Sequence, residues 1–90
     1  QASKNQMIPK SPTGLEVICY LPRPKATKKH VLFPITKPDL DNYAKSIMDG
    51  LNGFAWEDDN QVCELQICKR YVEEGKNPRI SIVIFPMVAA

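Results

Sequence analysis

The clearest pattern of apolar and polar positions along the chain lies between residues 40 and 51. Apolar side chains recur there at intervals of three and four positions, which is the spacing of one helix face. They are Leu40, Tyr43, Ala44, Ile47, Met48 and Leu51. Pro38 and Asp39 form a typical helix start, and Gly53 stands where a glycine often ends a helix. The pattern therefore predicts an amphipathic helix between Asp39 and Gly53.

Three segments outside the helix show the composition or the alternation of β-strands. Residues 15–21 are rich in β-branched side chains and lie between a glycine and a proline. Residues 61–72 alternate apolar and polar positions, and residues 79–86 form a β-rich run that ends at a proline. Because residues 73–78 hold the Gly, Asn and Pro of a turn, we expect the last two strands to pair as an antiparallel hairpin.

These elements follow the order strand, loop, helix, loop, strand, strand. Such a set forms a small two-layer α/β domain of the α+β kind, with the helix packed on a mixed or antiparallel sheet. Ninety residues suffice for one domain, so we expect residues 1–90 to be a single domain. Residues 1–13 are expected to be irregular or to end a preceding helix. Because the chain starts at Gln1 without a methionine, we also expect the sequence to be N-terminally incomplete.

Composition places the chain among ordinary globular proteins. The apolar share is 43%, the charged share is 24%, and the net charge of +2 is too small to indicate an anionic partner by itself. No apolar run approaches the roughly 18 residues that a membrane helix needs, and no secretory signal is visible. The cysteines, Cys19, Cys63 and Cys68, lack the spacing of a metal site, so we expect buried thiols in a reducing compartment.

Six of the ten acidic residues lie around the predicted helix: Asp39, Asp41, Asp49, Glu57, Asp58 and Asp59. Asp41 and Lys45 are four residues apart and share one helix face. The chain has to return along the helix for the sheet to cover its apolar face, and we expect this return to bring residues 57–59 toward Asp39 and Asp41. Carboxylates that meet without cations repel one another, whereas Mg²⁺ binds carboxylate oxygens. The cluster therefore predicts a Mg²⁺ site beside a lysine.

A structural alternative exists for each of these acidic residues. Asp39 is a common type of helix cap, and Asp41 suits the positive end of the helix dipole. Asp41 and Lys45 can form an ordinary surface ion pair, and residues 57–59 suit a solvated turn. The residues alone leave both interpretations open.

The stretch "KPDLDNYAKSIMDGLNGFAWEDDNQV" closely resembles the signature of the RusA-type Holliday-junction resolvases. The shared features are a KPD-x-DN opening, a lysine four residues after the second Asp, an Asp near the end of an apolar helix, and a double Asp followed by Gln and a strand. The spacing is kept at every element, and the resemblance extends over residues 37–71. The final "RISIVIF" segment is also similar to the family.

This resemblance implies a homodimeric α/β endonuclease, bacterial or phage-encoded and cytoplasmic, that requires Mg²⁺ and nicks four-way DNA junctions symmetrically. It places the family's metal-binding and catalytic aspartates at Asp39, Asp41 and Asp59, and its functional lysine at Lys45. Whether Mn²⁺ serves as well as Mg²⁺ stays open. The family usually has a strand and a helix before this segment, and most of that region is absent from these ninety residues.

The resemblance also suggests a role for the basic segment, residues 22–38, which is longer than a simple connection. Its side chains, together with two on the strand after the acidic turn, are candidate contacts to DNA phosphates. The candidates are Arg23, Lys25, Lys28, Lys29, Lys69 and Arg70. The alternative is a solvated loop. We expect Phe54 and Trp56 to pack against the core, with wedging into an opened junction as the alternative.

Two functions follow from these residues. The first is a Mg²⁺-dependent endodeoxyribonuclease that resolves Holliday junctions in DNA recombination and repair, as the resemblance implies. The alternative is a non-catalytic module derived from this family that binds branched DNA or a divalent metal ion. The absence of the family's N-terminal strand and helix favours the alternative.

Overall fold

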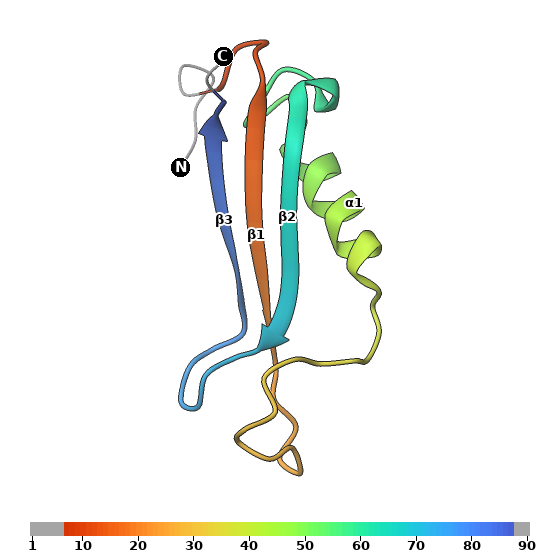
Figure 1. Cartoon of the computed structure of the whole chain (residues 1–90), viewed down its shortest axis with the longest axis vertical. Coiled ribbons are helices and arrows are strands. Elements are labelled where there is room, and N and C mark those ends of the chain that lie inside the picture. The colour runs from red at the N-terminus through yellow and green to blue at the C-terminus, as the bar shows by residue number, and fades with distance from the viewer. Residues whose placement is uncertain (1–6, 88–90) are drawn as a thin grey trace.

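The computed structural model of the chain describes residues 7–87, which form a three-stranded sheet with one helix packed on it (Figure 1). The elements in chain order are β1 (Thr13–Leu21), α1 (Leu40–Leu51), the 3-10 turn η2 (Asp59–Gln61), β2 (Val62–Tyr71) and β3 (Arg79–Pro86). The predicted helix, the three predicted strands and the two-layer α+β fold are confirmed. Residues 1–13 were expected to be irregular or to end a helix, and residues 1–6 of this segment lie outside the described residues. No helix among the described residues is long and apolar enough to cross a membrane.

β1 is the central strand, because the order of strands in the sheet is β2-β1-β3. It runs parallel to β2 and antiparallel to β3. The predicted hairpin between β2 and β3 is therefore wrong. The connection from β1 to β2 passes through α1, and a crossover of this kind returns the chain parallel to its first strand. β3 then pairs with the other edge of β1, where Val17 lies opposite Ile82.

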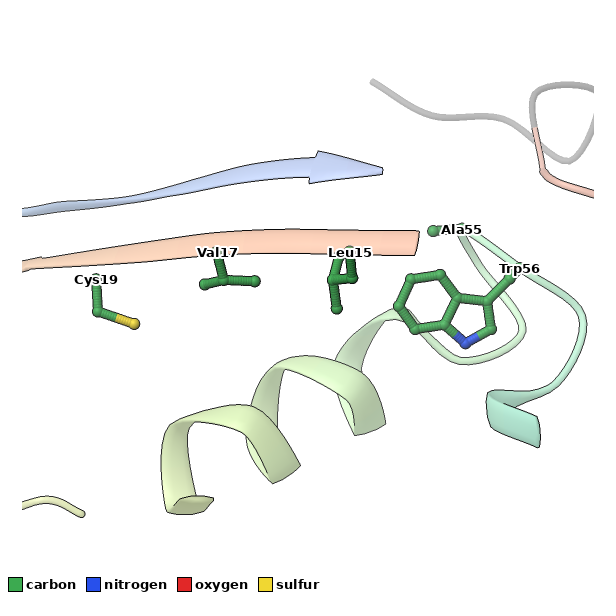
Figure 2. Packing of buried hydrophobic residues seen from close by; sticks show 5 residues of the cluster. All are labelled: Leu15, Val17, Cys19, Ala55 and Trp56. Carbon is green, nitrogen blue, oxygen red and sulfur yellow. The ribbon is translucent and has the colours of Figure 1, made fainter. Parts of the chain in front are cut away.

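Alternate side chains of β1 form the core beneath α1. Leu15, Val17 and Cys19 are at most 2% exposed, and Figure 2 shows them projecting from one face of β1 toward the helix. Half-buried side chains on the apolar face of α1 pack against them: Tyr43, Ile47, Met48 and Leu51. Burial of one large aliphatic side chain stabilises the fold by roughly 1.5–3 kcal/mol, so this contact holds the two layers together.

Trp56 closes the core beyond the C-terminal end of α1 (Figure 2). Its side chain is fully buried, and its Nε1 donates a hydrogen bond of 2.8 Å to Asp59 Oδ1. After the helix ends at Leu51, Gly53 adopts a φ of 75° and donates its N–H to the Trp56 carbonyl. Core packing is thus confirmed for Trp56 and wrong for Phe54, which is 51% exposed because the turn directs it away from the core.

The expectation of buried thiols holds for Cys19 alone. Cys19 is fully buried, and this burial raises the pKa of its thiol. Cys63 is exposed because it lies near the start of the edge strand β2. Cys68 is half-buried because it pairs with Ile18 and lies on the sheet face that α1 does not cover. All three are free thiols.

Gln61 ties the acidic turn to the segment before β1. Its side chain is 4% exposed. Its amide nitrogen donates to a distant segment, namely to the carbonyls of Pro9 and Ser11 and to Thr13 Oγ1. Its amide oxygen accepts hydrogen bonds from the N–H groups of Glu57 and Asp58 in its own turn. One side chain therefore satisfies polar groups on both sides of the turn and fixes its conformation.

We expect the substitution Gln61→Met to lower the free energy of unfolding by about 2–3 kcal/mol, because it leaves buried polar groups without partners. The change is measured by urea denaturation. Gln66→Met is the matched control, since Gln66 is exposed and, among residues 7–87, its amide hydrogen-bonds only to the Glu64 carboxylate, at 3.2 Å. Equal stability of the two variants would contradict this role for Gln61.

Candidate functional site

Asp39 and Asp41 stand at the N-terminal end of α1, and both are exposed. Asp39 is the residue that precedes the first helical turn, and its backbone carbonyl accepts hydrogen bonds from the N–H groups of Asn42 and Tyr43, at 3.1 and 3.4 Å. Its side chain makes no capping hydrogen bond. The helix therefore does not use the Asp39 carboxylate, and the capping alternative is not observed.

Lys45 follows Asp41 by one helical turn and is also exposed. An ion pair between the two is the structural alternative for both residues. In the described part of the chain, however, the ion pairs are Lys10–Asp58, Lys29–Glu74 and Arg79–Glu73. Asp39, Asp41 and Lys45 can therefore bind a ligand without first losing an ionic partner within these residues.

Asp59 lies in η2, on the other side of α1 in the sequence and in space. It is half-buried, and its Oδ1 accepts the hydrogen bond from Trp56 Nε1. Its acidic neighbours, Asp58 and Glu57, also form hydrogen bonds or ion pairs. Asp58 caps η2 with its side chain and lies 3.9 Å from Lys10 Nζ, and Glu57 Oε2 accepts a hydrogen bond of 3.0 Å from the N–H of Lys10. The acidic turn is therefore ordered by its own hydrogen bonds.

The three aspartates predicted to bind Mg²⁺ do not meet within one chain. Residues 7–87 contain no group of three or more His, Cys, Asp or Glu side chains that could hold a metal ion. α1 has twelve residues, which correspond to a length of about 18 Å at 1.5 Å per residue. η2 lies beyond its C-terminal end (Figure 1). The return along the helix is made by β2 rather than by residues 57–59, and the roles of Asp39, Asp41 and Asp59 stay predictions.

Asp39 and Asp41 by themselves still fit a hard divalent cation. Mg²⁺ is usually held by one or two protein carboxylates, with water and phosphate oxygens completing its coordination. Two exposed carboxylates at one helix end, neither in an ion pair of the described chain, match that donor set.

Lys69 reaches the segment before Asp39 from β2. Its Nζ donates hydrogen bonds to the carbonyls of Thr36 and Pro38, at 2.5 and 3.1 Å. Lys69 pairs with Cys19 across the two strands, so its side chain belongs to the sheet face that α1 covers. The sequence did not predict this contact. A signal was present, however, because Lys69 continues the alternation of Leu65 and Ile67 and is therefore a charged residue at an inward-facing position of β2.

Arg23 stabilises the conformation of the basic segment to which it belongs. Its Nη1 donates hydrogen bonds to the carbonyls of Lys28 and Val31, at 3.0 and 2.9 Å, and its guanidinium lies 5.1 Å from the centre of the Tyr71 ring. These contacts give Arg23 a structural role in the loop. Its contact with DNA stays a prediction.

A groove with a volume of about 400 Å³ opens beside the basic segment. Its charged lining consists of Arg23, Lys25, Lys29, Glu73 and Glu74. The Arg79 guanidinium hydrogen-bonds to Glu73 and lowers the pKa of that carboxyl from 4.5 to about 2, so Glu73 stays ionised even in mildly acidic solution. Because both signs of charge line the groove, exposed lysines outside it, such as Lys28, are the better candidates for phosphate contacts.

Arg70, the remaining candidate for a DNA contact, lies on β2 beside the same segment. Its guanidinium lies 5.7 Å from the centre of the Phe33 ring. A cation in this position supports the ring of an otherwise exposed aromatic residue.

Comparison with known proteins supports a family assignment for the whole arrangement. A family model described as "Endodeoxyribonuclease RusA" matches residues 1–85. Among curated proteins, "Uncharacterized protein YqaN" of Bacillus subtilis (strain 168) is 39% identical over 83 residues, which cover 81% of this chain and 56% of that protein. The chain thus spans little more than half the length of this relative. Because the family model covers α1, η2 and nearly all of the sheet, the chain belongs to the RusA family of endodeoxyribonucleases.

Proposed function

We propose that the chain is the catalytic region of a Mg²⁺-dependent endonuclease that resolves four-way DNA junctions by paired nicks. The observation that carries this proposal is the pair of exposed carboxylates, Asp39 and Asp41, at the start of α1. Neither belongs to an ion pair of the described residues. Membership of an endodeoxyribonuclease family supports DNA as the substrate.

In this proposal the helix start holds the metal and the phosphate together. Asp39 and Asp41 are the residues that would hold Mg²⁺, which supplies positive charge that stabilises the transition state of phosphodiester hydrolysis. Lys45 lies one turn further along α1, on the face of Asp41, where its ammonium can contact a phosphate oxygen or orient the attacking water. Hydrolysis leaves a 5′-phosphate and a 3′-hydroxyl.

Asp59 enters the proposal through a second copy of the chain. Within one chain η2 lies at the opposite end of α1 from Asp39 (Figure 1), so a site that contains all three aspartates takes Asp59 from a partner. A homodimer built in this way has two equivalent sites, which would allow one cut in each of two opposing strands. The separation of the aspartates therefore supports a homodimer.

DNA is proposed to lie across the end of the sheet where the basic segment meets the helix start (Figure 1). Lys28 is exposed there and lies outside the mixed-charge groove, and lysine contacts to phosphates give affinity without sequence preference. Phe33 and Ile35 of the same segment are 58% and 97% exposed. Since apolar side chains can unstack base steps, these two replace the buried Trp56 as candidate wedges.

A non-catalytic junction-binding module is the second candidate. It is favoured by the finding that residues 7–87 of a single chain hold no metal-binding group of three side chains. This function predicts that the wild-type protein binds a junction and leaves it uncut. The Asp41→Asn variant would then behave like the wild type.

We expect Asp41→Asn to reduce the rate of junction nicking by at least about 100-fold, because it removes a ligand charge from the metal. Junction affinity, measured by gel shift without metal, should be unchanged or slightly higher, since the substitution removes a negative charge near the phosphates. Glu16→Gln is the control, because it removes the same charge from an exposed residue outside the acidic cluster, and it should nick at the wild-type rate. Nicking by Asp41→Asn at the wild-type rate would refute the assignment.

Mixing two inactive variants tests whether the site is shared between copies. If Asp59 acts in the partner's site, a mixed dimer of Asp41→Asn and Asp59→Asn contains one doubly altered site and one intact site. We expect the mixture to recover nicking of one strand per junction, while each variant alone stays inactive. If all three aspartates act within one chain, the mixture stays inactive, and that result would contradict the shared site.

A further inference from the structure

Lys69 makes a contact that neither the family assignment nor the sequence predicts. Its ammonium bridges the carbonyls of Thr36 and Pro38, and Pro38 directly precedes Asp39. Lys69 itself lies on β2, in register with the fully buried Cys19 of the central strand. The contact thus links the sheet to the peptide that leads into the candidate site.

No other hydrogen bond holds this peptide in the described chain. The backbone hydrogen bond nearest before it joins the Tyr71 N–H to the Leu32 carbonyl, and the next one after it is accepted by the Asp39 carbonyl within the helix start. Residues 33–38 take part in no other hydrogen bond of residues 7–87. Among the hydrogen bonds of residues 7–87, those of Lys69 are therefore the ones that restrain this peptide where it enters α1.

The chemistry of the contact suits a positioning role. An ammonium has three donors and no acceptor, and a charged donor forms shorter and stronger hydrogen bonds with carbonyls than a neutral one. With two donors placed on Thr36 and Pro38, Lys69 restrains two points of one short peptide. Asp39 and Asp41 begin the helix immediately after it.

We propose that Lys69 is a positioning residue that orients Asp39 and Asp41 by holding the peptide before them. The inference rests on the proposed function in so far as these aspartates act in catalysis. It differs from the DNA contact predicted for Lys69 from the sequence, and the two roles give different experimental results.

The test compares Lys69→Met, which keeps the length of the side chain and removes its donors, with Lys69→Arg, which retains donors. Lys76→Met is the matched control, because it removes the same charge from an exposed turn. Three quantities are measured: the nicking rate at saturating DNA and Mg²⁺, the junction affinity and its salt dependence without metal, and hydrogen exchange of the free protein without metal.

For Lys69→Met we expect a saturated nicking rate about 10-fold or more below wild type, since small misplacements of catalytic groups are costly. Junction affinity should change by less than about twofold. Hydrogen exchange should quicken at residues 42–44, whose N–H groups form the first hydrogen bonds of α1, and stay unchanged in β1. Lys69→Arg should recover most of the rate, and Lys76→Met should match the wild type in all three measurements.

Three results would overturn the proposal. If Lys69→Met keeps the saturated nicking rate but binds the junction more weakly, and its affinity depends on salt as if one phosphate contact were lost, Lys69 is a DNA contact. Unchanged exchange at residues 42–44 would show that Lys69 does not hold the helix start. Faster exchange throughout β1 would show a general structural role. If the wild type does not nick junctions, the proposed function fails, and the exchange result alone then decides whether Lys69 positions this peptide.

Discussion

The burial of alternate β1 side chains beneath one face of α1 is the contact on which the rest of the structure depends. Leu15, Val17 and Cys19 are withdrawn from water, and α1 is the helix that covers them. The helix therefore lies along the sheet, with its start near the basic segment and its end near Trp56 (Figures 1 and 2). The crossover through α1 makes β2 parallel to β1 and leaves the other edge of β1 to β3.

This packing decides where the candidate chemistry lies. It places Asp39 and Asp41 at the start of α1 and Asp59 beyond its C-terminal end, so the length of the helix separates these carboxylates. A polar side chain then anchors each end. Lys69 holds the peptide before the helix, and Gln61 holds the acidic turn after it. In the proposed homodimer, each site combines Asp39 and Asp41 of one copy with Asp59 of the other.

Local signals explain which parts of this structure were predictable from the sequence. The helix bounds follow from an apolar stripe, a proline–aspartate start and a glycine stop, all of which act within a few residues. The strand order could not be predicted from the sequence. The alternation of apolar and polar residues in β2 and β3 allows either strand to pair with several neighbours, and both in fact pair with β1, which is distant in sequence. Trp56 and Phe54 look alike in sequence, and only the turn at Gly53 directs one inward and the other outward. The separation of Asp59 from Asp39 depends on the path of the whole crossover.

The most direct test of the account is the incubation of the wild-type protein with a synthetic four-way junction labelled in turn on each strand, with and without Mg²⁺. The account predicts cuts at symmetric positions on two opposing strands, only when Mg²⁺ is present, and products that carry 5′-phosphates. Stable binding of the junction with no cut strand at any Mg²⁺ concentration would contradict it.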